Sequence, residues 1–415
     1  MMPAEQRSAR LSLAYSNIGH TTMHVMTGLY LTIVLELVRE WQMGYEDLIR
    51  LWTFGALLIG LGAPLAGWLG DRWSDSRMIV VMFVLSGLGA IGAALADTPD
   101  QMMWALAVIG LGGAIYHPVG ISWTMKNAAN RGRAMGVLGI FGSMGVAGGS
   151  IVAGGLAALW GWHSAFLVPG LICLVFALAL GWHIARGAIM DRRADMVEST
   201  VPGRRELVRA FIILSVTMMC GGVIFQSLLT MSPKWFEQAV GTDLAGSTLG
   251  VGGLVTAVFL AGALPQFLGG LLADRLPVKW IYMGCALFQI PLYFLAMQVL
   301  GWSSIVLAAG MVALMNMQIP AENLLLAHYT PARYRGIAYG SKFVLSFGMA
   351  PLGVQLVAWA YGRTAGPELV FAVLAVLSSM VLLSAFLLPR EGKGPDGAVQ
   401  GKEGLSPVPV AGAGD

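Results

Sequence analysis

Apolar stretches of about 20 residues recur along this chain at intervals of roughly 30 residues, with short polar segments between them. A stretch of this length crosses a lipid bilayer as an α-helix. The pattern predicts twelve spans, at residues 12–37, 49–69, 78–96, 102–125, 134–159, 164–185, 209–231, 246–272, 280–299, 303–326, 336–360 and 367–388. The expected fold class is therefore an all-α membrane protein with twelve transmembrane helices.

The composition agrees with this pattern. Hydrophobic residues make up 57% of the chain, charged residues 11%, and the mean hydropathy is +0.72, which leaves too few charges to cover several soluble domains. The first span has no small-residue cleavage site and continues into Glu36 and Arg39, so we expect it to stay in the mature protein. The three cysteines, Cys173, Cys220 and Cys285, fall in different spans and define neither a disulfide framework nor a metal-ligand spacing. No metal or other cofactor is expected from this sequence.

The positive charges predict an orientation. With the N-terminus in the cytoplasm, 20 of the 25 Lys and Arg residues fall in the N-terminal tail, the loops after even-numbered spans and the C-terminal tail. Of the remaining five, Lys342 lies inside a span. The other four, Arg39, Arg50, Lys234 and Arg363, fall on the outer side. Because cytoplasmic loops are enriched in Lys and Arg, both termini are predicted to be cytoplasmic.

Three pairs of similar positions recur at nearly the same offset. The stretches "GWLGDRWSDSR" and "GLLADRLPVK" place Asp71 and Asp274 203 residues apart. The stretches "RGRAMG" and "RGIAYG" are 204 residues apart, and Pro118 and Pro320 are 202 apart. Such equal offsets predict two pseudo-symmetric halves of six helices each.

The polar segments divide the chain accordingly. We expect an N-terminal half at 1–185, a charge-dense cytoplasmic linker at 186–208 and a C-terminal half at 209–388. Residues 389–415, rich in Gly and Pro, are predicted to be a disordered cytoplasmic tail.

These motifs resemble the major facilitator superfamily over nearly the whole of 11–388. Its cytoplasmic signature, a Gly, an Asp four residues later and then a basic residue, is matched twice, by Gly67, Asp71 and Arg72 and by Gly270, Asp274 and Arg275. The Tyr-His-Pro of 116–118 with the following Arg-Gly-x-Ala-x-Gly run resembles the fosmidomycin-resistance-like branch. The resemblance implies two halves that rock about a central cavity, in a bacterial inner membrane. It makes these six signature residues candidates for conformational gating, with ordinary loop charges as the alternative for the four charged ones. Pro118 and Pro320 are gating candidates because a proline distorts its helix.

The sequence also departs from the superfamily. Ser74 and Pro277 replace a glycine usual later in the signature, and Leu106 stands about where proton-coupled drug exporters carry an intramembrane arginine. The Gly-rich fifth span lacks the proline of the antiporter signature. The resemblance alone therefore does not predict that this chain is a proton-driven drug exporter.

The first span carries a polar face. Asn17, His20, Thr21, His24 and Gly28 follow the i, i+3, i+4, i+7, i+11 spacing that gathers residues on one side of a helix. This face is predicted to line a wet cavity. Two alternatives remain open: the histidines hydrogen-bond to neighbouring helices, or the His20–His24 pair ligates a metal, for which the sequence shows no clear third ligand.

The tenth span carries Asn316, Gln318, Glu322 and Asn323 around Pro320. Glu322 is the only acidic residue well inside a predicted span. The cost of a charge in the membrane favours the protonated form of an isolated carboxylate, so Glu322 is a candidate proton carrier, with a structural partnership to a nearby base as the alternative.

Two further spans add polar candidates. Lys342 lies about six residues into the eleventh span, where it either snorkels to the inner surface, pairs with Glu322 or meets an anionic solute. In the seventh span, Gln226 and Thr230 are one turn apart and form a modest polar patch.

The stretch "GLGGAIYHPVG" (110–120) places His117 and Pro118 inside an apolar run. Pro118 leaves the carbonyl of Ala114 without its helical donor, and Pro320 does the same for Asn316, so both spans should be distorted at matching depths. Because distorted helices in the membrane are tolerated where they line a cavity, His117 is predicted to be a gate or site residue.

Together these features predict a secondary active transporter that moves a small organic solute by alternating access, coupled to protons, with efflux favoured by the branch resemblance. The open alternatives are an importer or metal-ion carrier of the same fold, and a transporter-like receptor or assembly subunit that does not translocate. The sequence has no His-Glu-x-x-His, phosphate loop or nucleophile-elbow motif in a sensible context, so no enzyme is expected. The expected partners are the solute, protons and the lipid bilayer; the chain is expected to be a monomer that binds no nucleic acid.

Overall fold

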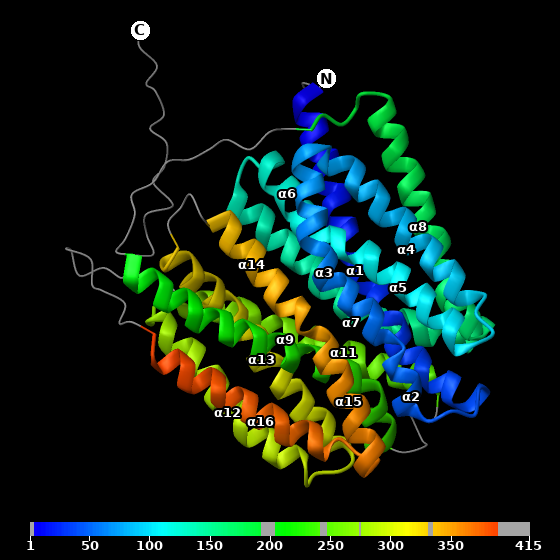
Figure 1. Ribbon diagram of the computed structural model, residues 1–415, viewed down its shortest axis with the longest axis vertical. Coiled ribbons are helices and arrows are strands. Elements are labelled where there is room, and N and C mark those ends of the chain that lie inside the picture. The colour runs from blue at the N-terminus through cyan, green and yellow to red at the C-terminus, as the bar shows by residue number, and fades with distance from the viewer. Residues whose placement is uncertain (1–3, 192–203, 241–246, 274, 331–334, 389–415) are drawn as a thin grey trace.

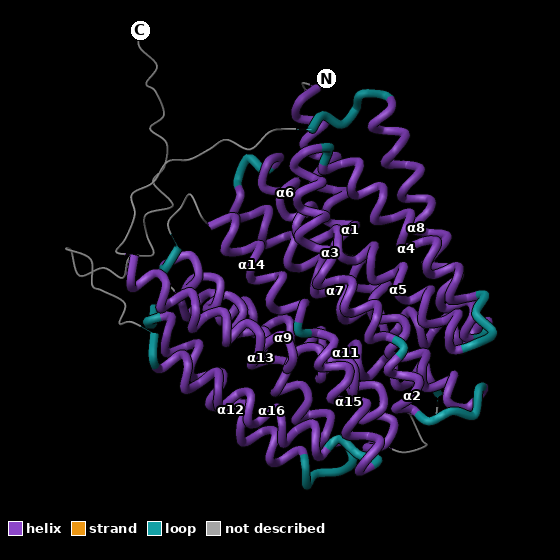
Figure 2. Tube along the Cα trace, viewed as in Figure 1, coloured by secondary structure: helices purple, strands orange, loops and turns teal. Residues whose placement is uncertain are grey.

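The computed structural model describes residues 4–191, 204–240, 247–273, 275–330 and 335–388. Within these residues it is helical, with twelve helices or helix runs long and apolar enough to cross a membrane (Figures 1 and 2). The predicted number of spans and the all-α class are therefore confirmed. Residues 192–203 of the expected linker, the expected tail 389–415 and Asp274 lie outside the described residues.

The first half of the chain folds into six spans. Its elements are α1 (Ala4–Glu40), α2 (Tyr45–Arg50), α3 (Trp52–Arg72), α4 (Asp75–Ala94), α5 (Pro99–Ile115), the π-helical turn η1 (Tyr116–Gly120), α6 (Ile121–Asn127), α7 (Arg131–Trp160) and α8 (Trp162–Ala185). Polar residues between the apolar stretches start several of these helices. The Ser74 hydroxyl accepts a hydrogen bond from the Arg77 amide at the start of α4, and the Thr98 hydroxyl accepts one from the Gln101 amide at the start of α5.

The second half repeats the arrangement. Its elements are α9 (Arg204–Val240), α11 (Thr248–Ala273), α12 (Val278–Ala296), α13 (Trp302–His328), α14 (Arg335–Gly348), α15 (Ala350–Thr364) and α16 (Glu368–Phe386). The helix α9 begins at Arg204, earlier than the span predicted from 209, because polar residues extend it beyond its apolar part. The eleventh predicted span is divided at Met349 into α14 and α15.

The two prolines predicted to distort matching helices differ in their effect. Around Pro118 the chain forms η1, a π-helical turn between α5 and α6, as expected where a proline removes a backbone hydrogen bond. By contrast, α13 is α-helical on both sides of Pro320. The distortion is therefore seen in the fourth span and not mirrored in the tenth.

The two halves meet at one end of the molecule and diverge toward the other (Figure 1). We call the end at which α1 begins and α16 finishes the terminal end, and the opposite one the distal end. At the distal end α7 and α11 pack so closely that a Cβ added to Gly154 would lie 2.3 Å from the Thr248 carbonyl oxygen. The Thr248 hydroxyl also donates to Glu36 of α1, and Arg39 pairs with Glu237 of α9 at 2.8 Å. A cavity lies between the two halves.

Candidate functional site

A cavity of about 300 Å³ lies between the two halves. Its wall combines apolar side chains with polar groups contributed by α1, η1, α9, α11, α12, α13 and α14. Its titratable and amide side chains are those of His20, His24, His117, Gln226, Gln266, Tyr282, Gln289, Asn316, Gln318, Glu322, Asn323 and Lys342. Asn17, one turn before His20 and half-buried, is not among the lining residues.

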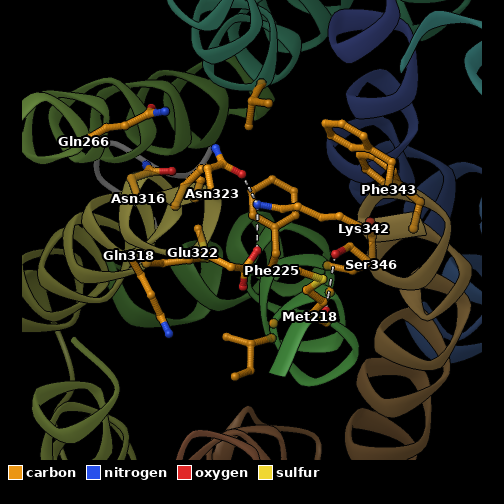
Figure 3. A pocket seen from close by; sticks show the side chains of 18 of the residues that line it. Met218, Phe225, Gln266, Asn316, Gln318, Glu322, Asn323, Lys342, Phe343 and Ser346 are labelled. Carbon is orange, nitrogen blue, oxygen red and sulfur yellow. Dashed lines mark hydrogen bonds and ion pairs between the residues drawn. The ribbon is translucent and has the colours of Figure 1, made fainter. Parts of the chain in front are cut away.

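A charge pair occupies the wall contributed by the second half (Figure 3). The Lys342 ammonium of α14 lies 2.6 Å from a carboxylate oxygen of Glu322 on α13, and both side chains are about nine-tenths buried, at 10% and 12% exposed. The ammonium also donates to the amide oxygen of Asn323 at 2.6 Å, and the Tyr282 hydroxyl donates to the second Glu322 oxygen at 2.9 Å. Lys342 therefore pairs with Glu322 rather than snorkelling to the surface, and Glu322 is not the isolated carboxylate expected from the sequence.

Amide side chains extend this polar wall. The Gln289 amide donates to the Gln318 oxygen at 3.3 Å, and the Asn316 amide donates to the backbone carbonyl of Gly262 at 2.9 Å, which links α13 to α11. The Gln226 amide donates to the Thr230 hydroxyl at 2.9 Å within α9. These hydrogen bonds fix the orientation of the amide side chains on the cavity wall.

Sequence reasoning missed three of these lining residues, namely Gln266, Tyr282 and Gln289. Gln266 is the single amide side chain of α11 and Gln289 that of α12, so a search for isolated amides within predicted spans would have found both glutamines. Tyr282 carries no such signal, because a tyrosine is common near either end of a transmembrane helix.

Three histidines occupy the opposite wall. The His20 and His24 rings of α1 lie 5.0 Å apart, and the His117 ring of η1 lies 5.4 Å and 5.5 Å from them. His117 also stacks on Phe343 and Phe347 of α14, at 4.8 Å and 4.6 Å. The π-helical turn thus places His117 against both α1 and a helix of the other half.

The first copy of the cytoplasmic signature packs against this turn. A Cβ added to Gly67 of α3 would lie 3.2 Å from the Cβ of Pro118, so the glycine allows α3 to approach η1 closely. At the corresponding Gly270 no atom of the described residues lies within 4 Å of an added Cβ. The two copies therefore have different surroundings, even though their sequences repeat.

The charges of the first signature belong to a cluster within one half. Lys126 of α6 lies 2.8 Å from the buried Asp75 carboxylate and 3.6 Å from that of Asp71, which is 75% exposed. The Asp191 carboxylate accepts hydrogen bonds from the Ser74 and Ser76 side chains. Asp75, which the sequence did not single out, is the closer partner of Lys126.

The basic residues of the signature lie on the surface. The Arg72 guanidinium lies 4.5 Å from the centre of the Trp68 ring, and Arg275 is exposed at the end of α11. Neither makes an ion pair that the described residues place between the two halves.

Twelve membrane-length helices among the described residues, in two halves with a cavity of apolar and polar side chains between them, define a multi-pass membrane transporter. The chain belongs to the major facilitator superfamily, whose family model, described as Major Facilitator Superfamily, matches residues 18–264. It is 26% identical over 346 residues to the MFS-type transporter YfnC of Bacillus subtilis, which covers 80% of this chain and 81% of the relative. It is 23% identical over 385 residues to the fosmidomycin resistance protein of Escherichia coli, covering 89% and 91%.

A solved structure shows the same fold. A bacterial homologue of the human lysosomal transporter Spinster matches with a TM-score of 0.71 at 14% sequence identity, over 92% of this chain and 94% of that one. This likeness, together with the twelve membrane-length helices of the described residues, confirms the fold class predicted from the sequence.

Proposed function

We propose that this protein is a proton-coupled secondary transporter that exports a small organic solute by alternating access. The observation that carries the proposal is the Glu322–Lys342 pair, which lies on the wall of a cavity between two halves. A single proton changes the charge of this pair, and alternating access exposes the same cavity to each side of the membrane in turn.

The chemistry of the pair explains how a proton and a solute are linked. While Glu322 is ionised, its carboxylate and the Lys342 ammonium neutralise each other, which offsets the cost of two charges inside the membrane. Protonation removes the negative charge and weakens the hold on Lys342. The protonation state of one carboxylate thus determines whether a cationic donor is available in the cavity.

Export is favoured because a relative that spans most of this chain is named for resistance to fosmidomycin. Uptake is a second candidate, and one observation favours it: a proton on Glu322 would free Lys342 for an anionic group, so that proton and solute travel together. The lining amides Gln266, Asn316 and Gln318 add hydrogen-bonding groups that suit an organic solute in either direction.

Counterflow in proteoliposomes tests the transport proposal. Purified protein is assayed against a panel of organic anions, cations and sugars, with a pH gradient imposed in each direction and with protein-free liposomes as the control. We expect counterflow of one solute class, with accumulation opposite to proton movement for an exporter. Accumulation in the same direction as protons supports uptake, and saturable binding without flux contradicts transport and indicates a receptor.

We propose that the chain acts as a monomer, because residues of one chain line the cavity. We also propose that it lies in a bacterial inner membrane with both termini in the cytoplasm. The asymmetry of Lys and Arg supports this orientation. A reporter active only in the cytoplasm should work when fused after Arg193 and fail when fused at Asp97, between the third and fourth spans. Activity at Asp97 would contradict the orientation.

We further propose that Gly67, Asp71, Arg72, Pro118, Gly270, Asp274, Arg275 and Pro320 serve in conformational gating. The contact of Gly67 with Pro118 supports this for the first copy, because it joins the signature to the turn that carries His117.

A further inference from the structure

Three of the six histidines of the chain meet at one point of the cavity wall. One ring nitrogen from each of His20, His24 and His117 lies within 4.8 Å of the other two. Two nitrogens bound tetrahedrally to one ion at about 2.0–2.1 Å lie about 3.4 Å apart. Small side-chain rotations therefore suffice for all three imidazoles to reach a common ion.

The hydrogen bonds leave nitrogens available at this point. His20 uses Nδ1 for the backbone carbonyl oxygen of Leu138, at 2.8 Å, and a donor Nδ1–H leaves Nε2 with its lone pair. His117 is 6% exposed, and neither of its ring nitrogens has a hydrogen-bond partner among the described residues. Because buried polar groups are nearly always partnered, His117 lacks a group that its surroundings should supply.

The surrounding packing holds the rings in place. His117 lies between the His pair and the stacked Phe343 and Phe347, and His20 stacks on Tyr116 at 4.7 Å. A Cβ added at Gly142 would lie 2.3 Å from Cε1 of His20, so the glycine makes room for this ring. Rings fixed by packing and a backbone carbonyl lose little freedom when they bind an ion.

Hydrogen bonding between helices does not by itself account for the cluster. It explains Nδ1 of His20 and gives no partner to His117, the most buried of the three. Three imidazoles that share one point also repel one another if more than one is protonated. A bound cation that takes one lone pair from each neutral ring gives each of the three a partner, including one of the two unpartnered nitrogens of His117.

We propose that His20, His24 and His117 bind one divalent transition-metal ion, with a further coordination position open to the cavity. Neutral imidazoles suit Zn²⁺, Cu²⁺ and Ni²⁺ better than Mg²⁺ or Ca²⁺, which prefer oxygen ligands. Three protein ligands and one open position are the arrangement in which zinc binds a water or an anionic group. The ion would give the cavity a second positive centre besides Lys342. The proposal does not depend on the proton coupling of Glu322.

Cobalt titration of the purified protein tests this site. The full chain is prepared in detergent without a polyhistidine tag and titrated with Co²⁺, whose visible absorption strengthens on four- or five-coordinate binding. We expect one Co²⁺ per chain, displaced by one equivalent of Zn²⁺ and unaffected by excess Mg²⁺. His20→Ala, His24→Ala and His117→Ala should each weaken binding by at least about 100-fold, since even outer ligands of metal sites contribute 10- to 100-fold.

The matched control is His328→Ala, because His328 is exposed at the end of α13 and far along the chain from the cluster. Its binding should equal that of the wild type, and gel filtration of every variant shows whether it is folded. A wild-type protein that gives no cobalt band would overturn the proposal. So would a band that persists in the triple variant or falls equally in His328→Ala.

Discussion

Glu322→Gln is expected to abolish accumulation driven by a pH gradient while exchange of solute for solute persists. Glutamine keeps the size of the side chain and its hydrogen bond to Tyr282 but cannot gain or lose a proton. Glutamine therefore resembles the protonated carboxyl group. The variant should still allow the two halves to rock, but this motion is no longer coupled to proton movement. The measurement is solute uptake into proteoliposomes, with and without a pH gradient, beside counterflow at equal pH.

Two further variants separate coupling from stability. Glu322→Gln leaves the Lys342 ammonium without its carboxylate, and removing one partner of a buried pair typically costs about 3–5 kcal/mol. The double variant Glu322→Gln with Lys342→Gln removes both charges and should restore the amount of folded protein without restoring gradient-driven accumulation. Glu46→Gln, outside the cavity, should behave as the wild type. Full pH-driven transport by Glu322→Gln would show that another group carries the proton.

Gly252→Val is expected to lower transport by at least about 10-fold by forcing the distal ends of the two halves apart. A Cβ added at Gly252 of α11 would lie 2.3 Å from the backbone carbonyl oxygen of Ser150 in α7, and backbone cannot move aside as a flexible side chain can. Overpacking of this kind costs about 1–3 kcal/mol, or roughly 5- to 150-fold in a conformational equilibrium. The conformation seen here, with the distal ends in contact, should become rare.

Labelling of a cysteine at Ser143, which lines the cavity, measures this shift. A membrane-impermeant maleimide applied from the terminal end should label Ser143→Cys more slowly in the Gly252→Val background. Gly253→Val is the matched control, because among the described residues an added Cβ there contacts just the end of the Ile151 side chain, at 3.6 Å. Equal labelling and transport in both valine variants would mean that the α7–α11 contact does not govern the change of conformation.

The same assay tests the gating role of the first signature. If Asp71 helps to hold the halves together at the terminal end in the alternate conformation, Asp71→Asn should favour the conformation seen here and speed labelling of Ser143→Cys, opposite to Gly252→Val. Unchanged labelling would assign Asp71, which is 75% exposed and near Lys126, to the surface charge of one half.

The histidines and Glu322 show which features of the site could be predicted from the sequence and which could not. Helical spacing alone put His20 and His24 on one face, and the apolar surroundings of His117 and Glu322 marked them as unusual. The His117 ring lies beside the other two only because η1 packs against α1, although these residues are almost one hundred positions apart in the sequence. Likewise, three interpretations of Lys342 were open until the α13–α14 contact placed its ammonium beside Glu322.

What the sequence by itself determined was the number of spans, their division into two halves and the family, because each depends on local length, hydropathy and spacing. A helix needs about 20 apolar residues to cross the bilayer wherever it lies in the fold. Only the tertiary structure decided that Asp75 rather than Asp71 is the closer partner of Lys126, that Pro118 and not Pro320 interrupts its helix, and that Gln289 lines the cavity. These outcomes depend on which helix faces meet, and in a membrane that choice rests on close packing and polar contacts between distant segments, which hydropathy along the chain does not record.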